Sequence, residues 1–472
     1  MRRFALLLVA GAPALVAAPL SPLVGQGFGV YEHNTCAMAR AGVAAASPCA
    51  DGSAIFFSPA GLAGLAGNHV SVGVTAIAAT GNFTDDLLAH RTDLNNPVIP
   101  VPNAYLTHQF SPKLTAGIGV YAPYGLETRW PVAGFEGRFL GYNTDVRSIY
   151  IQPTVGYQVH PRLKIGVGVA YITSHLKLRQ RQDLSSVPVP ATLLGLFPPP
   201  QPPPGTTFGM LGVATGTDFV DATLDASGSG FAVNFGGILK VTDRLSIGGH
   251  WLTRKKINYD GTAKFRPIST GLSLPVTIGT CPACVPAGTP VDALLASQFG
   301  AGGALDTTGI PVSTSIYMPP QGSLGFAYKV NDKWNVMADY QYVVWGWFNE
   351  VPIDFANAGT PDLTLRPANK NTHGFRFGAE YQYNTKVQLR GGYLYHTGAS
   401  PAQFVTPLLP EGARNEFTIG AGVELTPKLH ADLAYQYIKQ NDRRGTVNPA
   451  VGNTGLYQFK GNLFGIGLAY TF

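Results

Sequence analysis

One short polar turn recurs six times along the chain, each time between two runs in which apolar and polar residues alternate. Alternation with a period of two predicts β-strands, and a short polar turn between two such runs predicts a hairpin. Much longer stretches rich in Pro and Gly separate one hairpin from the next. The turns are 111–113, 160–162, 242–244, 331–333, 384–386 and 426–428, and each ends in Lys or Arg. Short turns at one end and long loops at the other are typical of an outer-membrane β-barrel whose turns face the periplasm.

The number of hairpins predicts an all-β fold of fourteen antiparallel transmembrane strands, because one strand precedes the first hairpin and one follows the last. An even number of strands places both chain ends on the periplasmic side. The expected strands are 69–80, 101–110, 114–123, 145–159, 163–177, 229–241, 245–258, 314–330, 334–345, 372–384, 386–397, 414–425, 429–439 and 459–472.

The alternation also predicts which side chains face lipid, because residues two apart share one face of a strand. In the last strand Phe464, Ile466 and Leu468 form an apolar row that we expect to face outward. In strand 372–384 Arg376 and Glu380 fall on the face opposite the aromatic residues, so we expect them in the lumen. A charge on the lipid face costs about 2–4 kcal/mol near the bilayer midplane, which makes the assignment informative.

The composition agrees with a barrel and argues against other classes of protein. Charged residues make up only 13% of the chain and 57 residues are Gly, a mix that is unusual for a soluble enzyme of 472 residues. The 33 Lys and Arg residues are scattered, so we expect no nucleic-acid binding. No Gly-x-Ser-x-Gly, His-Glu-x-x-His or phosphate loop occurs, so we expect no enzymatic activity and no cofactor.

The first residues are typical of a secretory signal peptide, which we expect at 1–25. Two arginines precede an apolar run, and the small residues Ala17, Ala18 and Gly25 offer cleavage sites. A permanent membrane anchor is the alternative, but prolines interrupt the apolar stretch. Export followed by insertion into the outer membrane is the expected route.

Residues 26–68 precede the first strand, lack alternation and are rich in Gly and Ala. A barrel of fourteen strands is wider than the eight-stranded size that side chains alone fill, so without an insert it should leak. We therefore expect 26–68 to form a plug inside a barrel that spans 69–472. The other arrangement is a segment that hangs below the barrel in the periplasm.

The four cysteines fall into two local pairs, Cys36 with Cys49 and Cys281 with Cys284. Exported proteins keep disulfide bonds, so two local disulfides are the preferred interpretation. A redox or zinc site at Cys281 and Cys284 is the alternative, although no further Cys or His lies close by and we expect no metal.

Several short stretches, in order along the chain, resemble the FadL-type family of outer-membrane transporters for long-chain fatty acids and hydrocarbons. The stretches are 26–32, 40–46, 54–62, 124–126 (Tyr-Gly-Leu), 409–414 and the last strand, which ends in Phe472. The plug of that family ends in Asn-Pro-Ala. This chain has Ser58, Pro59 and Ala60 there, so a shorter hydroxyl side chain replaces the Asn amide.

The resemblance implies a monomeric fourteen-stranded barrel with an N-terminal hatch that takes up hydrophobic small molecules without an energy source. It also implies sideways release into the membrane at a kinked strand 3, where Pro123 is the candidate because proline cannot donate to the ladder. The other interpretation is that Pro123 merely ends its strand. Expected partners are a fatty acid or hydrocarbon, outer-membrane lipid and lipopolysaccharide, and the assembly machinery that reads the C-terminal aromatic residue.

Three groups of residues are candidates for ligand binding. They are Phe56, Phe57, Leu62 and Leu65 in the plug; Leu193, Leu194, Phe197, Leu294, Leu295 and Phe299 in the long loops 178–228 and 259–313, where 291–299 is a candidate helix; and the cations Arg376, Arg390, Lys370, Lys177 and Arg179. Exposed apolar clusters often mark binding grooves, but long loops also pack on themselves. The cations could equally form lumen salt bridges with Glu380 or Asp432.

Two other functions remain open at this point. A general porin for polar solutes shares the barrel but needs an open lumen, so an ordered plug argues against it. An outer-membrane enzyme is the second alternative, and no catalytic motif supports it.

Overall fold

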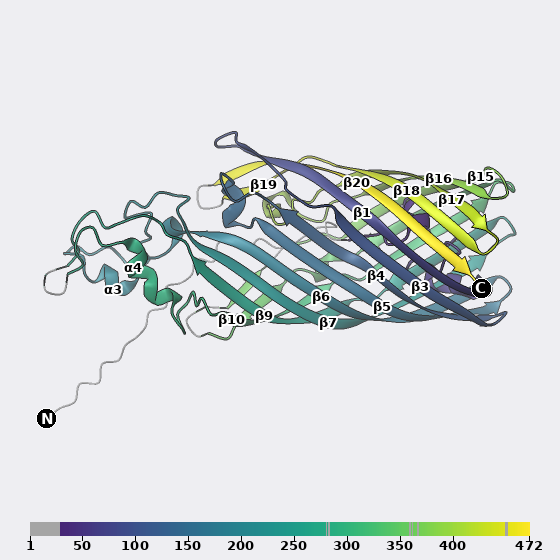
Figure 1. Ribbon diagram of the computed structural model, residues 1–472, viewed down its shortest axis with the longest axis horizontal. Coiled ribbons are helices and arrows are strands. Elements are labelled where there is room, and N and C mark those ends of the chain that lie inside the picture. Colours follow the sequence, from purple (N-terminus) through teal and green to yellow (C-terminus); the bar gives the residue numbers. More distant parts are fainter. Residues whose placement is uncertain are drawn as a thin grey trace, which may run out of the picture.

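The computed structural model describes residues 29–472 except 280, 282–283, 358–359, 361, 366–367 and 449–451. The chain forms a closed antiparallel β-barrel, seen from the side in Figure 1. It closes because β1 (Asn68–Asp85) pairs with β3 (Ile99–Ser111) on one edge and with β20 (Asn453–Thr471) on the other. The expected signal peptide and residues 26–28 of the expected plug lie outside the described residues.

Fourteen strands make up the wall, and two of them are each interrupted once. The continuous strands are β1, β3, β20, β4 (Leu114–Arg129), β5 (Asn143–His160), β6 (Leu163–Asp183), β7 (Asp218–Lys240), β12 (Trp334–Val343), β15 (Thr372–Gln382), β16 (Val387–His396), β17 (Arg414–Thr426) and β18 (Leu429–Gln440). The interrupted strands are β8 (Leu245–Leu252) with β9 (Lys255–Pro267), and β10 (Ile310–Met318) with β11 (Gln321–Lys329). Short strands at the loop end are β2 (Arg91–Asp93), β13 (Val351–Phe355), β14 (Leu363–Leu365) and β19 (Arg443–Asn448).

The predicted number of strands is confirmed, and the six predicted turns lie at the end of the barrel that carries the C-terminus (Figure 1). Two expected strands are not continuous, because 245–258 is divided at 253–254 and 314–330 at 319–320. Pro319 and Pro320 have no backbone N–H, so the ladder breaks there. The loop expected at 178–228 is shorter than predicted, since β6 continues to Asp183 and β7 begins at Asp218.

The predicted division of faces is confirmed by exposure. Phe464 and Ile466 are 57% and 50% exposed on the outer surface, whereas Arg376 and Glu380 are buried in the lumen. None of the helices in the described part of the chain is long and apolar enough to span a membrane.

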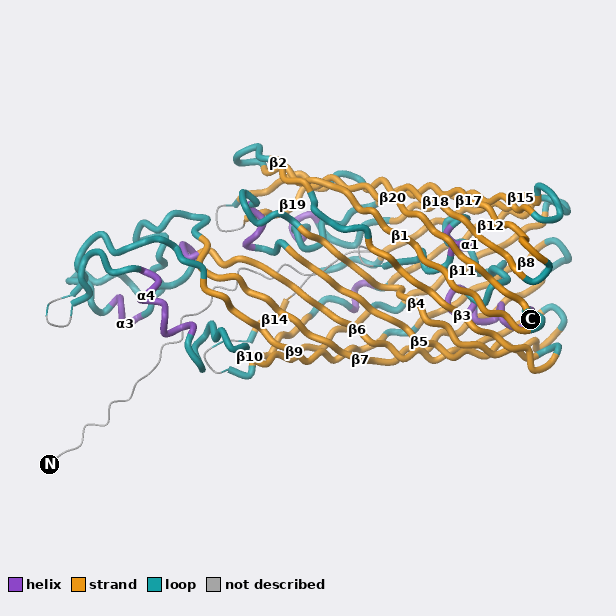
Figure 2. The backbone as a smooth tube through the Cα atoms, viewed as in Figure 1, coloured by secondary structure: helices purple, strands orange, loops and turns teal. Residues whose placement is uncertain are grey.

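Residues 29–67 lie inside the barrel and are almost entirely buried (Figure 2). They form α1 (Thr35–Met38), α2 (Ala54–Phe57) and the 3-10 helix η2 (Pro59–Gly64). Wall glycines permit close contact with this segment, which we call the plug. A Cβ at Gly378 would lie 2.8 Å from the carbonyl oxygen of Arg40.

At the loop end, the segments between β6 and β7 and between β9 and β10 pack on each other and form a cap (Figure 1). The cap contains α3 (Ala191–Leu194), η4 (Leu184–Ser186), α4 (Val291–Leu295) and η5 (Ala296–Phe299), so the candidate helix at 291–299 is present as a short α-helix followed by a 3-10 turn. The remaining short 3-10 helices are η3 (Glu136–Phe139), η6 (Trp345–Trp347) and η7 (Ala402–Phe404).

Candidate functional site

The barrel wall is interrupted between β3 and β4. The two strands pair from the turn at 112–113 as far as Ala104 and Val120, where the ladder stops. Contact between the two sides resumes near the loops, where the Arg129 N–H donates to the Asn96 side-chain oxygen at 2.7 Å. Beyond Ala104 and Val120 no β-ladder joins the described residues of β3 to those of β4.

Prolines flank this interruption on both strands. Pro100 and Pro102 lie in β3, and Pro123 lies in β4 where β4 shifts its register against β5. Proline has no N–H to donate to a neighbour, which gives the interruption a physical cause. Pro123 does not end its strand, because β4 continues to Arg129. Next to β3, the apolar side chain of Val98 is 60% exposed.

The plug bonds directly to β4 at this position. The Val30 N–H donates to the carbonyl oxygen of Pro123 at 2.9 Å, and Gly29 forms an isolated β-bridge with Tyr124. The first described residues of the plug therefore supply β4 with a partner just beyond the point where β3 no longer does.

Tyr124 also connects to the far side of the lumen. Its hydroxyl donates to the carbonyl oxygen of Pro319 at 3.4 Å and accepts hydrogen bonds of 3.0 Å from Lys255 Nζ and from Gln321 Nε2. From the plug, the Tyr31 hydroxyl donates to Gln321 Oε1 at 3.1 Å. These contacts join the plug, β4 and the interrupted strands in one network, which we call the constriction.

Lys255 is the unusual member of the constriction. Its side chain is buried, donates to the carbonyl oxygen of Pro319 at 3.1 Å, and lies 4.5 Å from the centre of the Tyr124 ring. No carboxylate lies within 4.0 Å of its ammonium group in the part of the chain that the structure describes. The strand breaks at 253–254 and 319–320 bring Lys255 to this position, since Lys255 pairs with Met318, which lies next to Pro319.

No sequence pattern singles out Lys255, because it lies in a run of three cations, 254–256, of the kind expected where a strand reaches solvent. The Pro-Pro pair at 319–320 was the available signal. It predicts a break in one strand but not which side chain of the neighbouring strand is buried beside it.

Aromatic side chains fill the lumen around the constriction. The Tyr121 ring stacks against the Tyr150 ring, with 5.8 Å between the ring centroids. The centroid of the His33 ring lies 4.3 Å from that of Phe56 and 5.0 Å from that of Phe57. Burial lowers the pKa of His33 to about 3, so the ring is neutral at ordinary pH and behaves as another aromatic group. The four plug residues expected to face a ligand, Phe56, Phe57, Leu62 and Leu65, are buried in the same apolar cluster as Tyr124.

Two of the expected cations hold the plug in place. Arg376 donates to the carbonyl oxygen of Gly42 at 3.2 Å and lies 4.4 Å from the centre of the Tyr31 ring. Arg390 forms ion pairs with Asp432 and with Glu380, and Glu380 also pairs with plug residue Arg40 at 2.9 Å. This matches the salt-bridge alternative for Arg390.

The other expected cations lie away from the lumen core. Lys177 and Arg179 project from the face of β6 opposite the buried Leu176 and Leu178. Lys177 pairs with Asp225 at 3.7 Å and Arg179 with Asp221 at 2.8 Å. Lys370 is exposed in the segment before β15.

The Ser-Pro-Ala stretch joins two parts of the plug. The Ser58 hydroxyl donates to the carbonyl oxygen of Ala45 at 2.9 Å, and Pro59 and Ala60 open η2. A disulfide bond joins Cys36 to Cys49 within the plug, and a second joins Cys281 to Cys284 in the cap.

The expected loop residues gather at the cap. Leu194 and Leu295 are buried in one apolar core with Phe208 and Phe265, and Leu193 and Phe299 pack against it. Phe197 and Leu294 are half-buried. The two loops thus pack on themselves, as the alternative interpretation stated.

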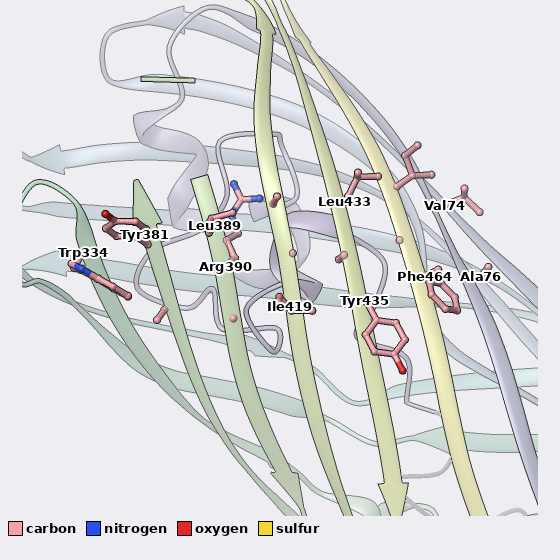
Figure 3. A pocket seen from close by; sticks show the side chains of 17 residues that line it. Val74, Ala76, Trp334, Tyr381, Leu389, Arg390, Ile419, Leu433, Tyr435 and Phe464 are labelled. Atoms are coloured by element: carbon pink, nitrogen blue, oxygen red, sulfur yellow. The ribbon is translucent and has the colours of Figure 1, made fainter. Parts of the chain in front are cut away.

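A hollow of about 1030 Å³ lies on the outer surface over β12, β15–β18, β20 and β1 (Figure 3). Exposed apolar side chains such as Ile419, Leu433 and Phe464 line it. Its position on the lipid face separates it from the lumen path, and lipid covers such a surface in a membrane.

Comparison with known proteins places the chain in a family. A family model described as outer membrane protein transport protein (OMPP1/FadL/TodX) matches residues 21–472. Outer membrane protein P1 of Haemophilus influenzae is 22% identical over 476 residues, which cover 94% of this chain and 95% of that protein. The 47 kDa outer membrane protein of Pasteurella multocida is 23% identical over 479 residues, covering 100% and 99%.

Solved structures have the same fold. A Pseudomonas aeruginosa FadL homologue has a TM-score of 0.77 at 18% identity, covering 94% of this chain and 100% of that chain. The Ralstonia pickettii toluene transporter TbuX has a TM-score of 0.64 at 19% identity, with the same two coverages of 94% and 100%. The family match includes both the barrel and the plug, and the relatives are outer-membrane proteins matched almost end to end. This chain is therefore a member of the OMPP1/FadL/TodX family of outer-membrane transport proteins and is not an enzyme.

Proposed function

We propose that this protein takes up long-chain carboxylates passively, holds the carboxylate at Lys255, and releases the ligand sideways between β3 and β4. The observation that carries the proposal is the burial of the Lys255 ammonium group with no carboxylate partner among the residues that the structure describes. A buried charge is costly unless it is paired, so the position favours a ligand that brings a negative charge.

The surroundings of Lys255 suit the rest of such a ligand. Tyr121, Tyr150 and Trp345 are buried in one apolar cluster with Tyr124, so an alkyl chain would exchange contacts with aromatic side chains rather than with water. An aromatic lining also suits a neutral hydrocarbon, and one related structure is that of a toluene transporter. Uptake of a neutral hydrocarbon is therefore the second candidate.

The plug acts as the gate in this proposal. It occupies the lumen and bonds to β4 through Val30, so its position and the state of the wall interruption are linked. A ligand favours the moved position of the plug if it binds that position more tightly. The shift in the equilibrium between the two plug positions cannot exceed the difference in ligand binding free energy between them. No energy source is needed. The filled lumen argues against a general porin.

The test replaces Lys255 with Met in the full chain and measures binding of palmitate and of hexadecane to the purified barrel in detergent. A hydrogen bond to a charged group contributes about 1.5–3 kcal/mol, so Lys255→Met should weaken palmitate binding roughly 10- to 100-fold and leave hexadecane binding unchanged. Lys370→Met, at an exposed lysine, is the matched control. If Lys255→Met weakened the binding of both ligands equally, or did not weaken palmitate binding, the proposed carboxylate site at Lys255 would be rejected. The second candidate, uptake of a neutral hydrocarbon, would then be favoured.

A further inference from the structure

The six short turns share one hydrogen bond as well as one sequence pattern. In each, the side chain of the first residue accepts the backbone N–H of the cation two residues later. The acceptor and donor pairs are Ser111 and Lys113 at 3.3 Å, His160 and Arg162 at 3.2 Å, Thr242 and Arg244 at 3.2 Å, Asn331 and Lys333 at 2.9 Å, Asn384 and Lys386 at 2.9 Å, and Thr426 and Lys428 at 3.3 Å. The backbone of each cation is thus fixed at the same place in its turn.

These cations, which we call the turn cations, are exposed and lack an ion-pair partner. All six side chains are exposed, and none lies within 4.0 Å of a carboxylate among the residues that the structure places. The same turns contain only two acidic residues, Asp243 and Asp332. Asp243 pairs with Lys240 at 2.9 Å rather than with a turn cation. The rim therefore has an excess of positive charge.

Exposed aromatic side chains lie directly beside several of these turns. Phe110 is 63% exposed, Trp334 43% and Tyr383 62%, and each is the direct sequence neighbour of one of the six turns. The C-terminal Phe472 is 55% exposed and follows Thr471, whose N–H donates to the carbonyl oxygen of Lys428 at 2.8 Å. Outer-membrane barrels carry belts of aromatic residues at the level where hydrocarbon meets head groups. If these aromatic residues mark that level, the turn cations next to them in sequence fall on its periplasmic side, where lipid head groups lie.

From this placement we propose that the turn cations form a ring that binds the phosphate groups of anionic phospholipids in the periplasmic leaflet. The chemistry is that of a juxtamembrane basic segment, in which each Lys or Arg near an anionic surface contributes to attraction. Spreading the cations around the whole rim lets several lipids bind at once. The ring would hold the barrel at a fixed depth, so that the interruption between β3 and β4 stays within the membrane. The proposal does not depend on the transported ligand.

The experiment reconstitutes the full chain in phosphatidylcholine vesicles and measures, by electron spin resonance, how spin-labelled phosphatidylglycerol and phosphatidylcholine partition to the barrel surface. The test variant carries Lys333→Gln, Lys386→Gln and Lys428→Gln, in turns that join neighbouring strand pairs. The control variant carries Lys256→Gln, Lys264→Gln and Lys439→Gln, which are exposed and lie away from the turns. Both variants lose three positive charges.

The wild-type barrel should select phosphatidylglycerol, and the test variant should lose about half of that preference because three of the six turn cations remain. High salt should reduce the wild-type preference as well. The control variant should keep it. Equal partition of the two lipids by the wild type, or equal losses in both variants, would overturn the proposal. Retention of the wild type but not the test variant on purified peptidoglycan, without lipid selection, would also overturn it.

Discussion

Val30 of the plug donates its backbone N–H to the carbonyl oxygen of Pro123 at 2.9 Å, in the strand that has just lost β3 as its neighbour. The start of the described plug thus bonds to the wall where the wall is incomplete. This bond links the start of the described plug to the strand beside the lateral interruption.

Deleting residues 27–57 should open the lumen. The deletion removes α1, α2 and both plug cysteines while leaving every wall strand intact. Because a fourteen-stranded barrel is wider than its own side chains can fill, ion conductance across a planar bilayer should rise. Saturable uptake of palmitate should weaken. Unchanged conductance in a correctly inserted deletion variant would rule out the plug as the barrier.

Restoring N–H donors beside the interruption should slow release into the membrane. The variant Pro100→Val, Pro102→Val, Pro123→Val gives β3 and β4 the donors that they lack, so the ladder can extend beyond Val120. Transfer of ligand into lipid should fall, with ligand binding unchanged. Pro311→Val, in a strand away from the interruption, is the control. Wild-type transfer in the triple variant would place the exit elsewhere.

Removing the plug disulfide should loosen the plug. In the chain-entropy model, a bond that closes a loop with a sequence separation of 13 contributes about 3 kcal/mol. Cys36→Ala with Cys49→Ala should therefore raise hydrogen exchange of plug amides by up to roughly 100-fold. Cys281→Ala with Cys284→Ala, which removes the cap disulfide, should leave plug exchange unchanged. Equal exchange in the first variant and the wild type would mean that wall contacts alone hold the plug.

Glu411, in the loop between β16 and β17, should make that loop sensitive to pH. Burial raises its pKa from 4.5 to about 7, while the N–H groups of Ser400 and Ala399 and the cations Arg414 and Arg443 act in the opposite direction. Between about pH 4.5 and 7 the folded loop keeps a proton that the unfolded chain loses, so stability falls as pH rises through this window, by up to about 3 kcal/mol.

The measurement is hydrogen exchange of residues 397–413, corrected for intrinsic rates, at pH 5 and pH 8. Wild-type protection should be lower at pH 8. Glu411→Gln keeps an oxygen acceptor and carries no charge, so protection should be equal at the two pH values. A wild-type loop with equal protection at both would contradict the raised pKa.

Much of the wall could be predicted because its information is local. Period-two alternation fixes the face of Phe464 or Arg376 from neighbours two residues away, and a turn such as 384–386 fixes one hairpin. The inner and outer faces, the number of strands and the local cysteine pairs all follow from such short patterns.

The contacts of the lumen could not be predicted in this way. Arg40 and Glu380 lie 340 residues apart, and Tyr124 and Gln321 lie 197 apart. Alternation says that a side chain points inward, but not which other inward side chain it meets. That depends on how far each strand is shifted against the next and on the path of the plug, and both are properties of the closed barrel.

The sequence by itself therefore determined an exported fourteen-stranded barrel with polar residues inside, because strand period and turn chemistry act over a few residues. Only the tertiary structure decided that Arg390 pairs with carboxylates, that Lys255 is buried with no carboxylate beside it in the described part of the chain, and that the prolines of β3 and β4 face the same interruption. Closing the barrel around the plug brings these groups together, and no local pattern records the distances across the lumen.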